Sequence, residues 1–171
     1  AVKDKADPPV AYVLDDAWDR FLAEFVPKVE ALRVGDPADE DTDVGPLIAS
    51  GERDRVLDWI GESKGEIVAG GTATHEGLVR PTVIVDPAPD DFVQTEEVFG
   101  PVVTVTRTSS LDQAIELANS TRYGLQAAIF TGSIQPALEA AARLEFGSVV
   151  VNEAPTFRAD QMPYGGVKAS G

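Results

Sequence analysis

Cysteine is absent from all 171 residues of this chain. Disulfides, thiolate metal sites and a cysteine nucleophile are therefore excluded within it. Histidine occurs only once, as His75, in the stretch "TATHEG", whose composition is that of an exposed loop. Metal sites and catalytic triads need several convergent groups, so we expect His75 to take part in neither.

Basic residues are also scarce. The chain has 14 Lys and Arg against 29 Asp and Glu, which gives a net charge of −15. This charge repels nucleic-acid phosphates and anionic membranes, so neither is expected as a partner. No stretch resembles a transmembrane span, and the first residues, "AVKDKADPPV", lack the apolar core of a signal peptide. We therefore expect a cytoplasmic protein.

The remaining composition, 43 % hydrophobic and 25 % charged, is ordinary for a soluble globular protein. Stretches typical of strands alternate with stretches typical of helices. Strands are expected at Val10–Leu14 and in "EIVAGG", "RPTVIVDPAP", "PVVTVTRT", "LQAAIFTG" and the buried-looking "SVVVN". Helices are expected at 17–32, at 50–64 and in "SSLDQAIELANSTRYG" and "SIQPALEAAARLEFG". The alternation predicts an α/β fold, a mostly parallel sheet with flanking helices.

Helix starts are indicated by residues whose side chains can cap backbone N–H groups. Asp15 and Asp16 can cap the first helix, and Ser50 the second. Ser110 and Gln113 have the spacing of a capping box at the start of the third.

Two other patterns are interpreted as non-functional. The acidic run 36–43 lacks the spacing of a calcium-binding loop, so we expect no metal there. Gly165 and Gly166 lack the strand-to-helix context of a phosphate loop.

The last twenty residues have no periodicity, which is typical of a functional or disordered loop.

The stretch "TEEVFGPVV", residues 95–103, places two carboxylates and a phenylalanine before a Gly-Pro turn and a strand. Glu96 and Glu97 could form a solvated turn, since surface glutamates are common. Alternatively, one of them faces a ligand with Phe99 beside it. The residues alone leave both interpretations open.

Several stretches occur together in a characteristic order and spacing: "RVGDPADEDTDVGPLI", "RPTVIVD", "TEEVFGPVVTV", "AIELANSTRYGLQAAIFT" and "GSVVVNEAPTFRADQMPYGGVKASG". In this order they resemble the NAD(P)-dependent aldehyde dehydrogenase superfamily, over roughly residues 11–171. The resemblance implies that residues 10–171 form part of an aldehyde dehydrogenase catalytic domain, preceded by an unmatched segment, 1–9. It also implies a small aldehyde substrate, NAD or NADP as cofactor, no metal, and a homo-oligomer.

In that family, a cysteine thiolate attacks the aldehyde to give a thiohemiacetal, a hydride passes to NAD(P)⁺, and a glutamate-activated water hydrolyses the thioester. The coenzyme domain, the glutamate base and the cysteine all precede the matched segment, and "AVKDKADPP" stands where the cysteine falls. We therefore expect a fragment of a longer enzyme, inactive alone. The alternatives are a degenerate homologue, a non-catalytic assembly module, and an acyl-thioester or acyl-phosphate reductase of the same superfamily.

The resemblance assigns roles to two residues of the Glu-Glu stretch. It implies that Glu97 holds the nicotinamide ribose, because a carboxylate can accept hydrogen bonds from two vicinal hydroxyls. It places Phe99 beside the nicotinamide ring, where an apolar ring would limit water. The alternative for Phe99 is a core residue under the sheet.

The resemblance also implies a substrate-binding set: Asn152, Phe157, Arg158 and Tyr164. Tyr164 matches an aromatic position of the aldehyde tunnel, or alternatively packs the loop onto the domain. Asn152 lies near the active site, or is a turn former that bonds its own backbone. Arg158 could pair with an anionic aldehyde, or be an ordinary surface arginine.

Overall fold

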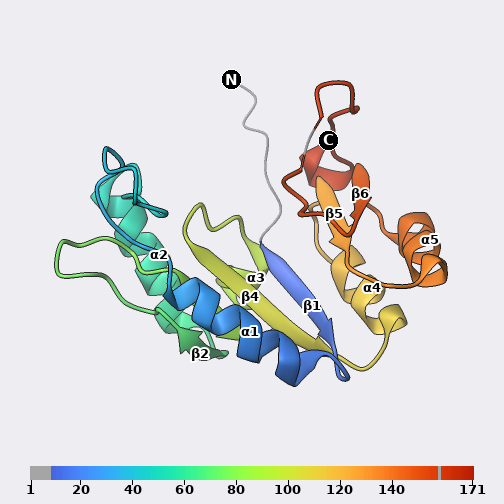
Figure 1. Ribbon diagram of the computed structural model, residues 1–171, viewed down its shortest axis with the longest axis horizontal. Coiled ribbons are helices and arrows are strands. Elements are labelled where there is room, and N and C mark those ends of the chain that lie inside the picture. Colours follow the sequence, from blue (N-terminus) through green and yellow to red (C-terminus); the bar gives the residue numbers. More distant parts are fainter. Residues whose placement is uncertain (1–8, 158) are drawn as a thin grey trace. The chain divides into compact units, whose positions relative to one another are not determined.

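The structure, a computed structural model, describes residues 9–157 and 159–171 (Figure 1). The described residues divide into two compact units, with Arg107 the last residue of one and Thr108 the first of the next. We describe each unit by itself. No helix among the described residues is long and apolar enough to cross a membrane.

The unit that ends at Arg107 is built on a four-stranded sheet in the order β1-β4-β3-β2. Its strands are β1 (Val10–Leu14), β2 (Glu66–Ala69), β3 (Thr82–Val85) and β4 (Val102–Thr108). The central pair, β3 and β4, is parallel, and β2 joins the outer side of β3 in the antiparallel sense. Its helices are α1 (Trp18–Glu30), α2 (Ser50–Glu62) and the short α3 (Phe92–Thr95).

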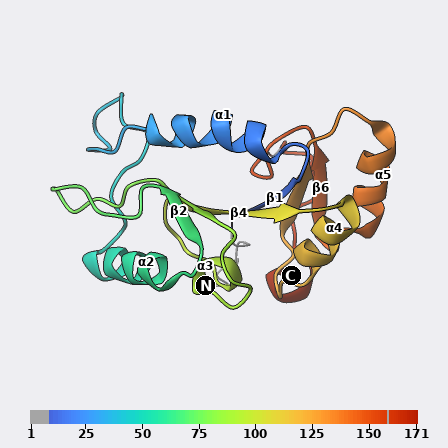
Figure 2. The ribbon, with the colours of Figure 1, turned by 90° about the horizontal axis from the view of Figure 1, so that it is seen from below.

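Helices cover both faces of this sheet. Figure 2 shows α1 along one face and α2 with α3 on the other. Alternate side chains of β3 therefore enter different cores. Val83 packs in the cluster beneath α1, whereas Ile84 packs with Val56 and Ile60 of α2. Burial on both faces explains why every residue of this strand is apolar or a buried threonine.

The second unit contains a βαβ element. Strands β5 (Gln126–Ile129) and β6 (Ser148–Val151) are parallel neighbours, and α5 (Ile134–Arg143) connects them. Before them lies α4 (Leu111–Asn119), and near the end is a single 3₁₀ turn, η1 (Lys168–Ser170). The strand predicted in "SVVVN" is present as β6, but its expected burial is wrong, because β6 is only partly covered and Val151 is 44 % exposed.

The predicted strands and long helices are confirmed, and the fold is α/β with a mostly parallel sheet. Two predicted caps are wrong. The first helix is preceded by Ala17 and the second by Ala49, neither with a side-chain cap. The Asp15 carboxylate instead accepts a hydrogen bond from Arg107. The capping role of Ser110 is confirmed, because its hydroxyl accepts from the N–H of Gln113 at 3.2 Å.

Candidate functional site

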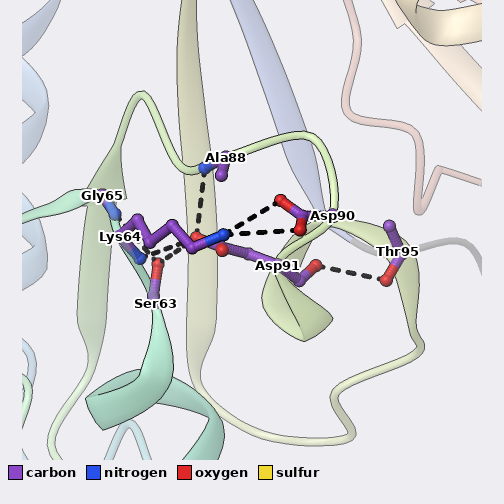
Figure 3. Close-up of polar contacts among 7 residues, drawn as sticks. All are labelled: Ser63, Lys64, Gly65, Ala88, Asp90, Asp91 and Thr95. Carbon is purple, nitrogen blue, oxygen red and sulfur yellow. Dashed lines mark hydrogen bonds and ion pairs between the residues drawn. The ribbon is translucent and has the colours of Figure 1, made fainter.

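A buried carboxylate, that of Asp91, restrains the segment that leads to Glu96 and Glu97. Asp91, which is 7 % exposed, immediately precedes α3. Its Oδ2 accepts hydrogen bonds from the Ser63 hydroxyl at 2.8 Å, the Lys64 amide at 2.8 Å and the Ala88 amide at 3.1 Å (Figure 3). Its own backbone carbonyl accepts from the Thr95 hydroxyl at 3.1 Å. This network joins the end of α2 to the start of α3.

The same contacts set the charge state of this carboxylate. Burial alone would raise the pKa of Asp91. The hydrogen bonds from Ser63, Lys64 and Ala88, with the positive charge of Lys64, outweigh burial and lower that pKa below its ordinary value. Asp91 is therefore ionised at neutral pH and acts as a fixed acceptor.

The two glutamates follow α3 directly. Glu96 has an extended backbone, and both glutamate side chains are half-buried rather than solvated. The next residue, Val98, is 1 % exposed and belongs to the core beneath α2. A buried valine directly after Glu97 anchors the chain, so that the positions of its neighbours on both sides are restrained.

Phe99 directly follows this anchor but does not join the core. Its φ is +49°, a left-handed conformation that a bulky residue rarely adopts and that costs roughly 1–3 kcal/mol. Its side chain is 63 % exposed, so the alternative of a core phenylalanine is wrong. Close packing of the next residue helps to hold this turn: a Cβ on Gly100 would lie 3.1 Å from Val56. Strain of this kind concentrates at ligand-binding sites.

In the second unit, Asn152 directly follows β6 and contacts Thr131, the second residue after β5. Its Oδ1 accepts from the Thr131 amide at 2.8 Å, and its Nδ2 donates to the Thr131 carbonyl at 2.9 Å. Its φ of +57° is the left-handed conformation that asparagine tolerates better than most residues. The side chain thus bonds the backbone of another segment and not its own. The local alternative is wrong.

The aromatic candidates of the C-terminal loop are both on the surface. Phe157 is 48 % exposed and Tyr164 is 52 % exposed. The carbonyl of Phe157 accepts a hydrogen bond from the side chain of Gln126 at 3.1 Å, which ties this part of the loop to β5. Arg158 lies outside the described residues.

The end of the loop is held by contacts that the sequence did not reveal. A Cβ on Gly147 would lie 1.8 Å from the Gly165 carbonyl, so the loop passes where only glycine fits. Lys168 donates from Nζ to the Asn119 carbonyl at 2.7 Å and pairs with Glu145 at 3.2 Å. Within the Gly-Gly pair, a Cβ on Gly166 would lie 2.5 Å from the Ser170 carbonyl oxygen, so Gly166 serves close packing of the loop. The spacing of these residues carries no signal, because the partners are distant along the chain.

The predicted site residues fall into two groups. Glu97 and Phe99 adjoin one buried anchor in the first unit. Three others lie in the second unit: Asn152, Phe157 and Tyr164. The described residues contain no cluster of His, Asp or Glu that could hold a metal ion. His75 is exposed, and its Nε2 lies 3.8 Å from a carboxylate oxygen of the neighbouring Glu76.

Comparison with known proteins places these features in one family. A family model described as the aldehyde dehydrogenase family matches residues 7–171. A 3-sulfolactaldehyde dehydrogenase of Priestia aryabhattai is 39 % identical over 162 residues, which cover 94 % of this chain and 34 % of that protein.

Two solved structures also match. Aldehyde dehydrogenase 21 of Physcomitrella patens, in complex with the reaction product succinate, aligns with a TM-score of 0.91 and 36 % identity, over 95 % of this chain and 34 % of that one. The NADP complex of a glyceraldehyde-3-phosphate dehydrogenase of Methanocaldococcus jannaschii aligns with a TM-score of 0.88 and 40 % identity, over 94 % of this chain and 35 % of that one. The chain thus spans about a third of the length of these relatives. With a family model that matches nearly all of its residues, this chain belongs to the aldehyde dehydrogenase family.

Proposed function

We propose that this chain forms part of the catalytic domain of an NAD(P)⁺-dependent aldehyde dehydrogenase that oxidises an aldehyde to a carboxylic acid. The observation that carries this proposal is the turn at Glu97–Phe99 in a member of this family. A half-buried carboxylate and an exposed aromatic ring stand two residues apart, on either side of a buried valine, and the backbone of Phe99 is in a strained left-handed conformation.

These two side chains fit a nicotinamide nucleotide. The Glu97 carboxylate supplies two acceptor oxygens, which suit the vicinal hydroxyls of a ribose. The Phe99 ring supplies a flat apolar surface, which suits the face of a nicotinamide and excludes water from it. When bound, the nicotinamide accepts the hydride that leaves the aldehyde carbon. NAD and NADP share this half of the molecule, so the turn does not distinguish them.

The loop of the second unit supports the aldehyde side of the proposal. Phe157 and Tyr164 present exposed rings to a substrate, and the hydroxyl of Tyr164 adds a polar contact. Both polar ends of the Asn152 amide are occupied by Thr131, which favours a role for Asn152 in holding this loop rather than in direct contact with the aldehyde.

Arg158 adds a cationic group next to Phe157 in the sequence. The Priestia relative acts on a sulfonated aldehyde, and the Physcomitrella enzyme is seen with a dicarboxylate product. Both ligands are anionic, which supports an anionic aldehyde as the substrate of this protein and Arg158 as the residue that pairs with it.

Because the chain contains no cysteine, the nucleophile of this proposed reaction has to come from sequence outside it. The family resemblance implies the same for the glutamate base. The experiment is to recover the complete reading frame that contains these residues and to assay its product with NAD⁺, NADP⁺ and a panel of aldehydes. We expect NAD(P)H formation that is lost when a cysteine shortly before Val10 is replaced by serine, and no turnover by the 171-residue chain alone. A frame without such a cysteine, or turnover by the chain alone, would overturn the proposal. NADPH consumption with an acyl thioester instead would favour the reductase alternative.

A further inference from the structure

Helix α2 lies along the segment that leads to the candidate cofactor turn, and successive turns of the helix contact successive parts of it. Ser63, just past the helix end, bonds Asp91. One turn earlier, Trp59 stacks on Phe92 with ring centroids 5.4 Å apart. One further turn earlier, Arg55 bonds Val98, and Val56 is close to Gly100. Residues spaced by four share one face of a helix, so a single face of α2 follows the segment from 91 to 100.

Arg55 is the member of this face that touches the turn itself. Its Nη2 donates a hydrogen bond of 2.8 Å to the carbonyl of Val98, which lies between Glu97 and Phe99. The guanidinium is held in place from two other sides. It donates to Glu52 from Nε at 3.0 Å and from Nη2 at 2.8 Å, and it lies 4.3 Å from the centroid of the Trp59 ring. Arg55 is therefore a preorganised donor in a defined position.

This hydrogen bond controls a specific degree of freedom. The Val98 carbonyl and the Phe99 amide belong to one planar peptide unit. Fixing the carbonyl fixes the plane on the N-terminal side of Phe99, whose φ of +49° is unfavourable for a bulky side chain. Without the donor, the peptide unit is free to rotate toward the more favourable extended region, and both neighbouring side chains would change direction.

We propose that Arg55 is a positioning residue for the cofactor turn. It holds the peptide unit between Val98 and Phe99, so that the Glu97 carboxylate and the Phe99 ring face the same nicotinamide nucleotide. This inference rests on the proposed function for its ligand, whereas its structural part stands on the hydrogen bonds alone.

The structural part is tested by NMR on the 171-residue chain, with Arg55→Met and Arg55→Lys as variants. Methionine removes the donor, and lysine keeps the charge without the planar fork. Arg53→Lys is the matched control, because Arg53 is on the same helix and pairs with Asp54.

We expect Arg55→Met to move the carbonyl carbon signal of Val98 and the backbone signals of Phe99, with smaller shifts in Arg55→Lys and none in the control. Core methyl signals of Val83 and Ile84 should stay in place, which shows that the fold is kept. Unchanged Val98 and Phe99 signals in Arg55→Met would overturn the proposal.

The functional part is tested in the complete enzyme with the same substitutions. We expect the dissociation constant for the cofactor that supports turnover to rise about tenfold in Arg55→Met, the scale for loss of one charge-assisted hydrogen bond, and to rise less in Arg55→Lys. The KM for the aldehyde should change little. An unchanged cofactor affinity together with moved Phe99 signals would overturn the positioning role for the cofactor. If the wild-type enzyme binds neither NAD⁺ nor NADP⁺, the proposed function fails, and the NMR result separates that failure from a failure of the Arg55 contact.

Discussion

The Ser63 hydroxyl donates a hydrogen bond of 2.8 Å to the buried carboxylate of Asp91, and this contact joins the end of α2 to the start of α3. Two backbone amides, from Lys64 and Ala88, complete the shell around the same oxygen. The network includes no residue with a proposed chemical role. Its effect is to fix where the chain begins the four-residue helix that leads to Glu97.

Replacement of Asp91 by asparagine should lower the free energy of unfolding at pH 7 by about 1–3 kcal/mol, because the three donors to its buried carboxylate lose a charged acceptor. The neighbouring variant Asp90→Asn is the control. Asp90 is 79 % exposed at its side chain and forms a surface ion pair with the Lys64 ammonium at 3.3 Å, so its loss should cost under about 0.5 kcal/mol. Urea unfolding of the wild type and the two variants measures both effects. Equal midpoints for Asp90→Asn and Asp91→Asn would contradict the role of Asp91 as a buried acceptor that stabilises the fold.

The same network gives a dependence on pH whose sign is defined. The pKa of Asp91 is lower in the folded chain than its ordinary value of 3.8. Its stabilising contribution is therefore fully present above the ordinary pKa and is lost as the pH falls through the lowered one. The difference in unfolding free energy between wild type and Asp91→Asn should shrink as the pH falls through this acidic range. A difference that stays constant down to the acid transition would show that Asp91 is not the ionised acceptor.

Two substitutions of Asn152 distinguish the contribution of its side-chain hydrogen bonds to stability from that of its left-handed backbone conformation. Asn152→Gly removes both bonds to Thr131 but tolerates the φ of +57°, whereas Asn152→Ala removes the bonds and adds strain. We expect Asn152→Gly to cost about 1–2 kcal/mol and Asn152→Ala roughly 1 kcal/mol more. Hydrogen exchange at the Thr131 amide should become faster in both variants. Unchanged protection of that amide would contradict the bridge between the ends of β5 and β6.

The second unit carries exposed apolar side chains, among them Phe130 at 69 %, Ile134 at 73 % and Leu138 at 64 %. We therefore expect the chain to self-associate. The net charge of −15 opposes association by repulsion, and salt screens that repulsion. Sedimentation velocity should show a dimer or larger species that increases from low to moderate salt. Monomer at every micromolar concentration in both buffers would contradict the prediction.

Sequence patterns predicted those parts of the fold that depend on near neighbours in the chain. The Ser110 cap was predictable because its donor is three residues away. The Asp15 cap was not, because its carboxylate is used by Arg107, ninety-two positions later. The short α3 was missed for the same reason, since its start depends on Asp91 bonding Ser63 and Lys64 of another segment.

The candidate site shows the same division. The motif around Glu97 and Phe99 is recognisable in the sequence, and the family resemblance implies the proposed roles of these two residues. The left-handed backbone of Phe99 and its exposed ring were not visible, because a phenylalanine before Gly-Pro is equally compatible with a core position. The contact of Arg55 with Val98 joins residues 43 positions apart, and the contact of Lys168 with Asn119 joins residues 49 positions apart.

The role of Glu97 is tested most directly by the rate of hydride transfer in the complete enzyme, with Glu97→Gln compared against Glu96→Gln. The amide keeps the shape of the side chain but loses the charge that strengthens hydrogen bonds to a ribose. We expect Glu97→Gln to lose roughly 1.5–3 kcal/mol of transition-state stabilisation, or about ten- to 150-fold in kcat/KM, with Glu96→Gln close to wild type. Single-turnover formation of NAD(P)H and the cofactor dissociation constant supply the comparison. Equal hydride-transfer rates and cofactor affinities for Glu97→Gln and wild type would contradict the assignment of this turn to the cofactor.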